Sequence, residues 1–159
     1  MKIFSKDQLI KALLIPVVVV LAIVLSPLWL CLWLSWLVKG ALLNIKFRVK
    51  WVRKGKHILY VYSESPKWQR YIEENIVPKL DGKVVLLNWS KRSEWKKVKP
   101  LEAKVLEYWG GESEFNPLAI VFLPRGKVKV IRFHKAFMDF RHGKDALLKS
   151  KESELYEVL

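Results

Sequence analysis

A run of 27 residues, 12–38, contains no charged side chain. Its least apolar members are two serines and two prolines, and no polar face interrupts it. A helix of about 20 apolar residues crosses the hydrocarbon core of a bilayer. A surface helix of a soluble protein, in contrast, carries a polar face. The sequence therefore predicts a single-pass transmembrane helix over residues 12–38.

Two alternatives for this run remain open. Pro27 lies near its middle and either kinks one spanning helix or divides it into two shorter halves. Two halves form a re-entrant hairpin that returns to the same side. Trp29, Trp33 and Trp36 follow at helical spacing and are typical of an aromatic belt at one membrane interface.

The charges around the run predict its orientation. The chain has 29 Lys and Arg residues against 15 Asp and Glu, a net charge of +14. Three lysines precede the run, whereas seven basic residues lie in residues 39–56. The positive-inside rule thus favours a cytoplasmic C-terminal domain. A short basic start before an apolar run also resembles a signal-anchor, which would leave the orientation open. A cleaved signal peptide is disfavoured, because the run is longer than the apolar part of such a peptide and has no A-x-A site.

The part after the run has 121 residues, enough for one compact domain. Three basic residues and one acidic residue precede the run, so this part carries a net charge of +12. A positive field of this size favours anionic lipid or phosphorylated ligands. The single cysteine, Cys31, lies inside the run. A disulfide, a cysteine-based zinc site and a thiol nucleophile are therefore excluded from the domain.

The chain divides into four segments. Residues 1–11 are a short basic tail, and residues 12–38 are the transmembrane segment. Residues 39–56 are a basic juxtamembrane segment or strand, because Ile45, Phe47, Val49 and Trp51 alternate with basic residues. The same pattern suits an interfacial segment that lies on anionic lipid. Residues 57–159 form an α/β domain.

Within this domain, β-branched and aromatic runs predict strands at residues 57–62, 83–89, 118–123 and 127–133. Helices are predicted at residues 66–77, with Ser65 as N-cap, at residues 94–109, with a break near Pro100, and at residues 144–158. Residues 134–142 are predicted to be a loop. Two right-handed crossovers make the first strands parallel, a short turn makes the last two a hairpin, and helices cover both faces.

This β-α-β-α-β-β-α order resembles the thioredoxin-like fold superfamily over residues 57–158. Asn116-Pro117 stands directly before the third strand, where thioredoxin-like proteins carry a cis-proline that faces the active-site loop. The resemblance implies a thioredoxin-like sandwich. Thioredoxins act through a C-x-x-C motif where the first strand meets the first helix, but the corresponding residues 62–67 contain no cysteine. Disulfide exchange requires a thiolate, so the chain is predicted to be a non-redox member and not a thiol-disulfide oxidoreductase.

Candidate ligand-binding residues lie in loops at the carboxyl ends of the strands, where open α/β sheets bind ligands. The loop after the first strand leads into a helix N-terminus, whose N–H groups suit an anion. The loop after the second strand carries basic and aromatic groups. An ordinary N-cap and a solvated loop are the structural alternatives. With the proline before the third strand, the candidates are Ser63, Glu64, Ser65, Lys67, Trp89, Lys91, Arg92 and Pro117.

No catalytic residue, metal site or cofactor is predicted. His134 and His142 are eight residues apart, which is not a metal-ligand spacing, and glycine-rich phosphate loops are absent from the sequence. Phe137 and Phe140 indicate either a partner-facing or membrane-facing patch or part of the core. Basic residues are spread over the domain without a recognition motif, which argues against nucleic-acid binding.

These features predict a membrane-anchored, non-redox binding or adaptor protein. Its partner would be a protein or an anionic ligand at the membrane surface, besides the anionic lipid of the membrane itself. One alternative is a membrane-associated enzyme that uses the strand-end loops on a phosphorylated or lipid-linked substrate. Another is an accessory subunit whose membrane helix makes the recognition. The sequence leaves the oligomeric state open.

Overall fold

The computed structural model describes residues 6–95, 98–111 and 116–159, with side chains from residue 14 onward. Of the predicted basic tail, residues 1–5 lie outside the described residues, and the first helix, α1, begins within the tail. The chain divides into two compact units, Met1–Ala41 and Leu42–Leu159. The described residues of the first unit belong to α1, and the second unit contains the last turns of α1 and an α/β domain.

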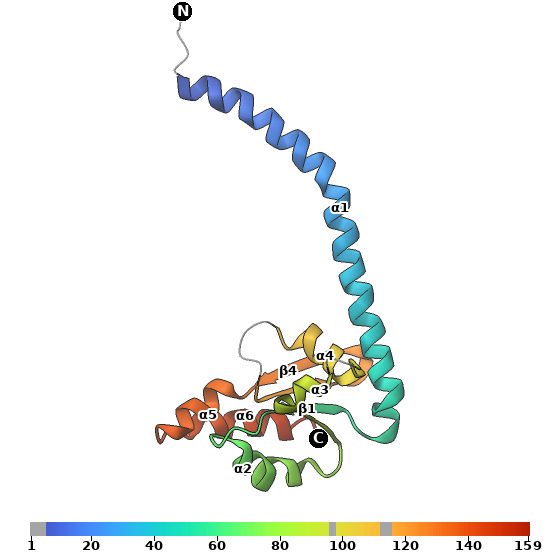
Figure 1. Ribbon diagram of the computed structural model, residues 1–159, viewed down its shortest axis with the longest axis vertical. Coiled ribbons are helices and arrows are strands. Elements are labelled where there is room, and N and C mark those ends of the chain that lie inside the picture. Colours follow the sequence, from blue (N-terminus) through green and yellow to red (C-terminus); the bar gives the residue numbers. More distant parts are fainter. Residues whose placement is uncertain (1–5, 96–97, 112–115) are drawn as a thin grey trace, which may run out of the picture. The chain divides into compact units, whose positions relative to one another are not determined.

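Helix α1 (Lys6–Lys50) is continuous through Pro16 and Pro27 (Figure 1). A hairpin that turns at Pro27 is therefore not formed. Every side chain of residues 14–39 is exposed. Among the described residues, α1 is the one helix long and apolar enough to cross a membrane.

A hydroxyl group replaces the backbone hydrogen bond that Pro27 removes from α1. Proline lacks the N–H that would donate to the carbonyl of Ile23, four residues earlier. The Oγ of Ser26 donates to this same carbonyl at 2.8 Å. The Oγ of Ser35 donates to the carbonyl of Leu32 at 2.7 Å, but that carbonyl also has a helical N–H donor. Ser26 alone of the two thus repairs a broken backbone bond.

If α1 spans a bilayer, as the sequence predicts, Ser26→Ala should weaken its insertion by about 1–2 kcal/mol, because it leaves a carbonyl unpaired in an apolar environment. Ser35→Ala is the matched control and should change insertion by less than about 0.5 kcal/mol, since its acceptor keeps the backbone donor. Glycosylation reporters on both sides of the segment measure the inserted fraction. Equal losses in the two variants would contradict this role of Ser26.

The second unit is built on a four-stranded sheet of order β2-β1-β3-β4. β1 and β2 are parallel, with Ile58 opposite Val84, and β3 is antiparallel to both β1 and β4. The four predicted strands and the final hairpin are confirmed, but only the first two strands are parallel. The strands are β1 (Ile58–Tyr62), β2 (Val84–Asn88), β3 (Leu118–Phe122) and β4 (Val128–Arg132).

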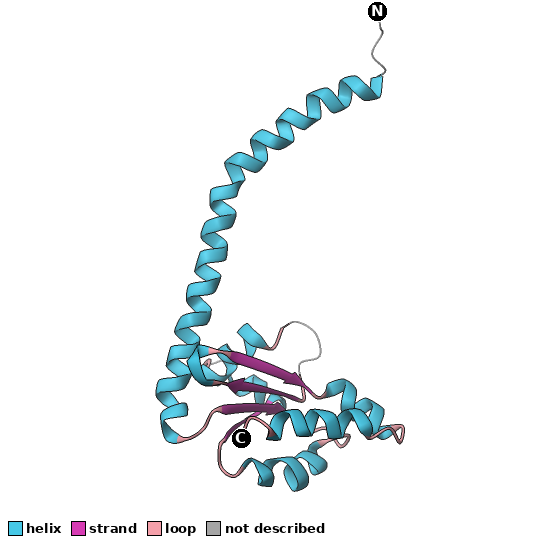
Figure 2. Cartoon of the chain, turned by 180° about the vertical axis from the view of Figure 1, so that it is seen from behind, coloured by secondary structure: helices cyan, strands magenta, loops and turns pink. Residues whose placement is uncertain are grey.

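Helices cover both faces of this sheet, as predicted (Figure 2). One face packs on α2, η2, η3, α5 and α6, and the other packs on α4 and the last turns of α1. β2 is an edge strand, and its Leu86 is exposed. After α1 the helical elements are η1 (Val52–Lys54), α2 (Gln69–Tyr71), η2 (Ile72–Ile76), η3 (Val77–Leu80), η4 (Trp89–Lys91), α3 (Arg92–Trp95), α4 (Leu101–Trp109), η5 (Pro124–Gly126), α5 (His134–Arg141) and α6 (Ala146–Tyr156).

Two segments that were predicted as a strand and a loop are helical instead. Residues up to Lys50 are helical, so the strand predicted within residues 39–56 does not form. Leu43 and Phe47, four residues apart, share the buried face of this helix. Residues 134–141 form α5 instead of a loop. Phe137 is fully buried there, so the core alternative holds for it, whereas Phe140 is 38% exposed.

Side chains of α1 fasten its last turns to the domain. The Phe47 ring stacks on Phe122 of β3, with centroids 3.9 Å apart. Asn44 Nδ2 donates to the Gly126 carbonyl at 2.6 Å, and the Arg48 guanidinium donates to the Leu123 and Lys127 carbonyls around the same turn. The sequence analysis assigned this end of the helix to a separate juxtamembrane segment. In the structure it contributes side chains to the core of the domain and hydrogen bonds to the turn between β3 and β4.

A buried carboxylate on α4 adds to this attachment. Glu102 is 7% exposed and accepts hydrogen bonds from Lys50 Nζ, at 2.8 Å, and from Trp51 Nε1. Burial by itself raises the pKa of Glu102, but the bonds from Lys50, the backbone and Trp51 outweigh it, and the pKa lies below its ordinary value of 4.5.

We expect Glu102→Gln to lower the free energy of unfolding at pH 7 by about 1–3 kcal/mol, because a charge-assisted bond is lost. A lowered folded-state pKa gives stability that is complete above pH 4.5 and is lost as the pH falls through the folded value. The difference between the two proteins should therefore shrink in acid. Urea unfolding at pH 7 and pH 3 measures it, and a constant difference would contradict the ionised pairing.

Candidate functional site

Three loops meet at the carboxyl ends of β1 and β2, as the sequence predicted. Ser63 Oγ donates to Asn116 Oδ1 at 2.8 Å and accepts from Trp68 Nε1 at 3.2 Å. These bonds join the loop after β1 to the residue before Pro117. Pro117 itself is buried, its bond to Asn116 is cis, and its carbonyl accepts the Phe133 N–H at 2.9 Å.

The loop after β1 is also bonded to the loop after β2. The backbone N–H of Glu64 donates to Ser90 Oγ at 2.9 Å, and Asn88 Nδ2 donates to Glu64 Oε1 at 2.8 Å. Asn88 Oδ1 in turn accepts the Ser90 N–H at 2.9 Å. The polar groups at this edge of the sheet are therefore bonded to one another and set the shape of the edge.

Tyr62, the last residue of β1, is anchored beside this network. Its hydroxyl donates to Glu73 Oε1 at 3.1 Å. Burial is the main cause, and this hydrogen bond the second, of the rise in the pKa of Tyr62 to about 12. Tyr62 is accordingly a neutral donor at physiological pH.

The helix after β1 starts later than predicted, so its N-terminus does not lie at residues 65–67, where the anion site was predicted. α2 begins at Gln69 rather than at Pro66, and Trp68 precedes it without a side-chain cap bond. Trp68 is held in the core by Phe137 and bonded to Ser63, which places a turn before the helix. Ser65 Oγ accepts only a 3.4 Å contact from the Lys67 N–H, and Lys67 is exposed.

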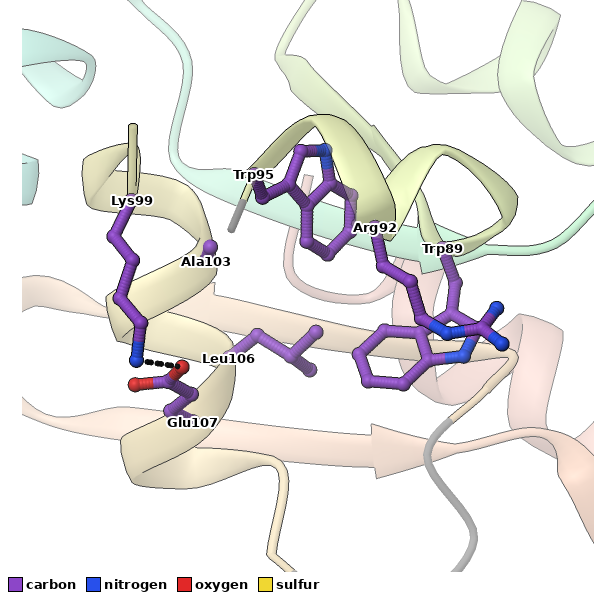
Figure 3. Close-up of a pocket in the computed structure, with 7 residues that line it drawn as sticks. All are labelled: Trp89, Arg92, Trp95, Lys99, Ala103, Leu106 and Glu107. Atoms are coloured by element: carbon purple, nitrogen blue, oxygen red, sulfur yellow. Dashed lines mark hydrogen bonds and ion pairs between the residues drawn. The ribbon is translucent and has the colours of Figure 1, made fainter. Parts of the chain in front are cut away.

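Trp89 and Arg92, two of the predicted residues, line a pocket beside the second loop (Figure 3). The pocket has a volume of about 180 Å³ and lies between η4 with α3 and the helix α4. Trp89 and Trp95 meet edge to face, with ring centroids 5.8 Å apart. The floor is Ala103 and Leu106 of α4. The Ser63, Glu64, Ser65, Lys67, Lys91 and Pro117 side chains are not among those that line this pocket.

Charged groups stand at the mouth of this aromatic pocket. The Arg92 guanidinium lies 5.7 Å from the centroid of the Trp89 ring, within cation–π range. Lys99 Nζ and Glu107 Oε1 are 3.0 Å apart on the opposite rim. Both of these side chains are more than half exposed, so their ion pair contributes at most about 1 kcal/mol. The site therefore combines an apolar interior with a polar rim.

Sequence reasoning missed Trp95, Lys99, Ala103, Leu106 and Glu107. The sequence indicates only part of this site. Trp95 follows Trp89 by six residues, and Pro100 predicts that a new helix starts after it. The approach of α4 to the two tryptophans depends on packing against the sheet, which no local pattern shows.

No metal site is found where the structure describes the chain: groups of three His, Cys, Asp or Glu side chains that could hold an ion are absent there. His134 begins α5, where its ring packs edge to face on Trp68 at 5.8 Å, and His142 is exposed after the end of that helix.

Comparison of the chain with protein-family models, with curated proteins and with solved structures finds no match. The function is therefore argued from the chain's own residues.

Proposed function

We propose that this chain is a membrane-anchored, non-redox binding protein that holds a protein partner at the membrane surface. α1 is the anchor, and the α/β domain carries the binding site. The observation that carries the proposal is the pocket between Trp89 and Trp95, with Arg92 at its mouth.

The anchor is supported by the surface of α1. Its side chains from residue 14 to residue 38 are exposed and almost all apolar, and the hydroxyls of Ser26 and Ser35 are bonded to helix carbonyls. Such a surface is unfavourable in water and favourable in hydrocarbon. The excess of basic residues after the run supports a cytoplasmic domain by the positive-inside rule.

A thioredoxin-like arrangement of the domain is part of the proposal. It is supported by the β-α-β-α-β-β order, which ends in the two helices α5 and α6, and by the position of Pro117 directly before β3. The loop after β1, where that family carries its cysteines, is instead closed by hydrogen bonds from Ser63 and Glu64. In this arrangement the loop after β1 occupies the position of the thioredoxin active-site loop but cannot carry out thiol chemistry.

The size of the Trp89/Trp95 pocket favours a protein partner over a small-molecule substrate. Small-molecule sites usually measure about 300–1,000 Å³, whereas this pocket measures about 180 Å³. That is suited to one inserted side chain. Trp and Arg are also the residue types most enriched where interfaces gain most of their affinity. We infer that the partner inserts an apolar or aromatic side chain and presents a carboxylate to Arg92.

A comparison of three variants tests this. Full-length protein is purified from membranes in mild detergent, and the co-purifying proteins are quantified by mass spectrometry. Trp95→Ala and Arg92→Gln should each remove the same partner, by about tenfold or more. Lys91→Gln, which removes an equal charge one residue away and outside the pocket, should retain it. Equal recovery from all three variants would contradict the site.

A further inference from the structure

A second groove lies on the same unit, between the last turns of α1 and the start of α4. Its volume is about 440 Å³. It is separate from the Trp89/Trp95 pocket, and neither the strand-end loops nor the proposed partner contacts use it. Three apolar side chains, Ile45, Val49 and Leu101, and three lysines, Lys46, Lys50 and Lys104, line most of it.

The apolar part of this groove belongs to an exposed stripe on α1. Leu42, Ile45 and Val49 are 50%, 58% and 50% exposed, although they recur at helical spacing on one face. Leu43 and Phe47 of the same helix are buried in the domain, and Leu43 also lines the inner part of the groove. Scattered exposed apolar residues are ordinary, but a continuous stripe marks a surface that binds something.

The rim of the groove carries an excess of positive charge. Lys50 is paired with Glu102, but among the ion pairs formed by the described residues none includes Lys46 or Lys104. The positive surface continues around Trp51, where the ammonium groups of Lys50, Lys54 and Lys56 lie 4.9, 5.7 and 5.6 Å from the ring centroid. The groove thus attracts an anion.

An apolar stripe with lysines beside it is complementary to a phospholipid with an anionic headgroup. Lysine ammonium groups bind phosphate as point charges. Apolar side chains on the same helix face suit the upper part of an acyl chain. The stripe starts at Leu42, four residues after the charge-free run ends. Juxtamembrane lysines in such a position are attracted to anionic leaflets.

We propose that this groove binds one anionic phospholipid, with its phosphate held by Lys46, Lys50 and Lys104 and its acyl chain against Ile45 and Val49. The inference rests on the proposed membrane anchor, because the groove meets a lipid only if α1 spans the bilayer. The bound lipid lies against the last turns of α1 and the start of α4, two elements that Glu102 already joins.

The test uses the full-length chain reconstituted in nanodiscs of phosphatidylcholine with one-fifth phosphatidylglycerol. After mild detergent extraction, mass spectrometry gives the ratio of the two lipids that remain bound. The wild type should retain phosphatidylglycerol preferentially. Lys46→Gln with Lys104→Gln should reduce this preference by about 25-fold, since each lysine near the surface contributes a factor of roughly five.

The matched control is Lys135→Gln with Lys144→Gln, which removes the same charge from exposed positions in and after α5. It should leave the preference unchanged. Equal losses in the two double variants, or no preference in the wild type, would overturn the lipid site. Displacement of the bound lipid by millimolar glycerol phosphate would also overturn it, because the groove would then be a site for a soluble anion.

These outcomes are distinct from failure of the anchor. If α1 does not span, the wild type fails to incorporate even in nanodiscs of pure phosphatidylcholine. If only the lipid site is wrong, the wild type and both variants still incorporate fully. A circular dichroism spectrum of each variant checks that the fold is intact, as expected for substitutions of exposed lysines.

Discussion

A fragment that begins at residue 42 will fold in solution, whereas one that begins at residue 57 will not. Leu43 and Phe47 supply core to one face of the sheet, and Phe47 is fully buried against Phe122. Removing a buried Phe side chain alone costs about 3–5 kcal/mol. The total stability of a domain is only about 5–15 kcal/mol, so losing both residues leaves little of it.

The same effect is measurable without truncation. Phe47→Ala should lower the free energy of unfolding of the 42–159 fragment by about 3–5 kcal/mol in urea. Ile45→Ala, two residues away on the exposed face, should lower it by less than about 0.5 kcal/mol. Equal unfolding midpoints for the fragments starting at residues 42 and 57 would contradict the assignment of this helix end to the domain.

The second large effect concerns the anchor. Leu21→Arg with Val24→Arg should abolish membrane integration. Each arginine near the centre of a spanning helix costs about 2.5–3.5 kcal/mol on the biological insertion scale, so the pair costs about 5–7 kcal/mol. The double variant should be extracted from membranes at alkaline pH, whereas the wild type should stay in the pellet.

Leu21→Ala with Val24→Ala is the control for this experiment. It shortens the same two side chains without adding charge, and the remaining apolar residues of the run are enough to span. The alanine variant should remain in the pellet. If the arginine variant also remained there, residues 12–38 would not lie in hydrocarbon.

The strands were predictable because their signal is local. β1 and β3 are composed almost entirely of apolar residues, mainly β-branched and aromatic in β1, and every residue of both is buried. A sequence of this kind has few alternatives to a central strand. The break before α4 was predictable for a similar reason, since Pro100 cannot continue a helix.

The helix end of α1 was not predictable from alternation, because two patterns overlap in it. Ile45, Phe47 and Val49 alternate with basic residues as in a strand, while Leu43 and Phe47 are spaced as in a helix. Continuity with the preceding apolar helix and packing on Phe122 decide between them. Phe133, directly before α5, and Phe137 within it are also spaced as in a helix. The polar residues between and after them made this segment resemble a loop.

Part of the site followed from the sequence, because the chain order alone brings the loops after β1 and β2 to one edge. What that edge does chemically depends on partners that are distant in sequence. Ser63 and Glu64 are engaged by Asn116, Asn88 and Ser90. The pocket formed instead where Trp95 meets α4, which tertiary packing alone determines.

Cys31 offers the most direct test that α1 spans a membrane. It is the only cysteine of the chain and lies within the apolar run. A charged maleimide reacts with a thiol that water reaches, and it does not enter hydrocarbon. Cys31→Ala with Ser150→Cys, a thiol at an exposed position of α6, is the positive control, in membranes opened by freezing and thawing.

We predict that less than about one-tenth of Cys31 reacts in these membranes and that it reacts fully after denaturation in SDS, while the cysteine at position 150 reacts in both conditions. Labelling of Cys31 in the membranes to the same extent as the control would contradict the proposal of a membrane-anchored protein.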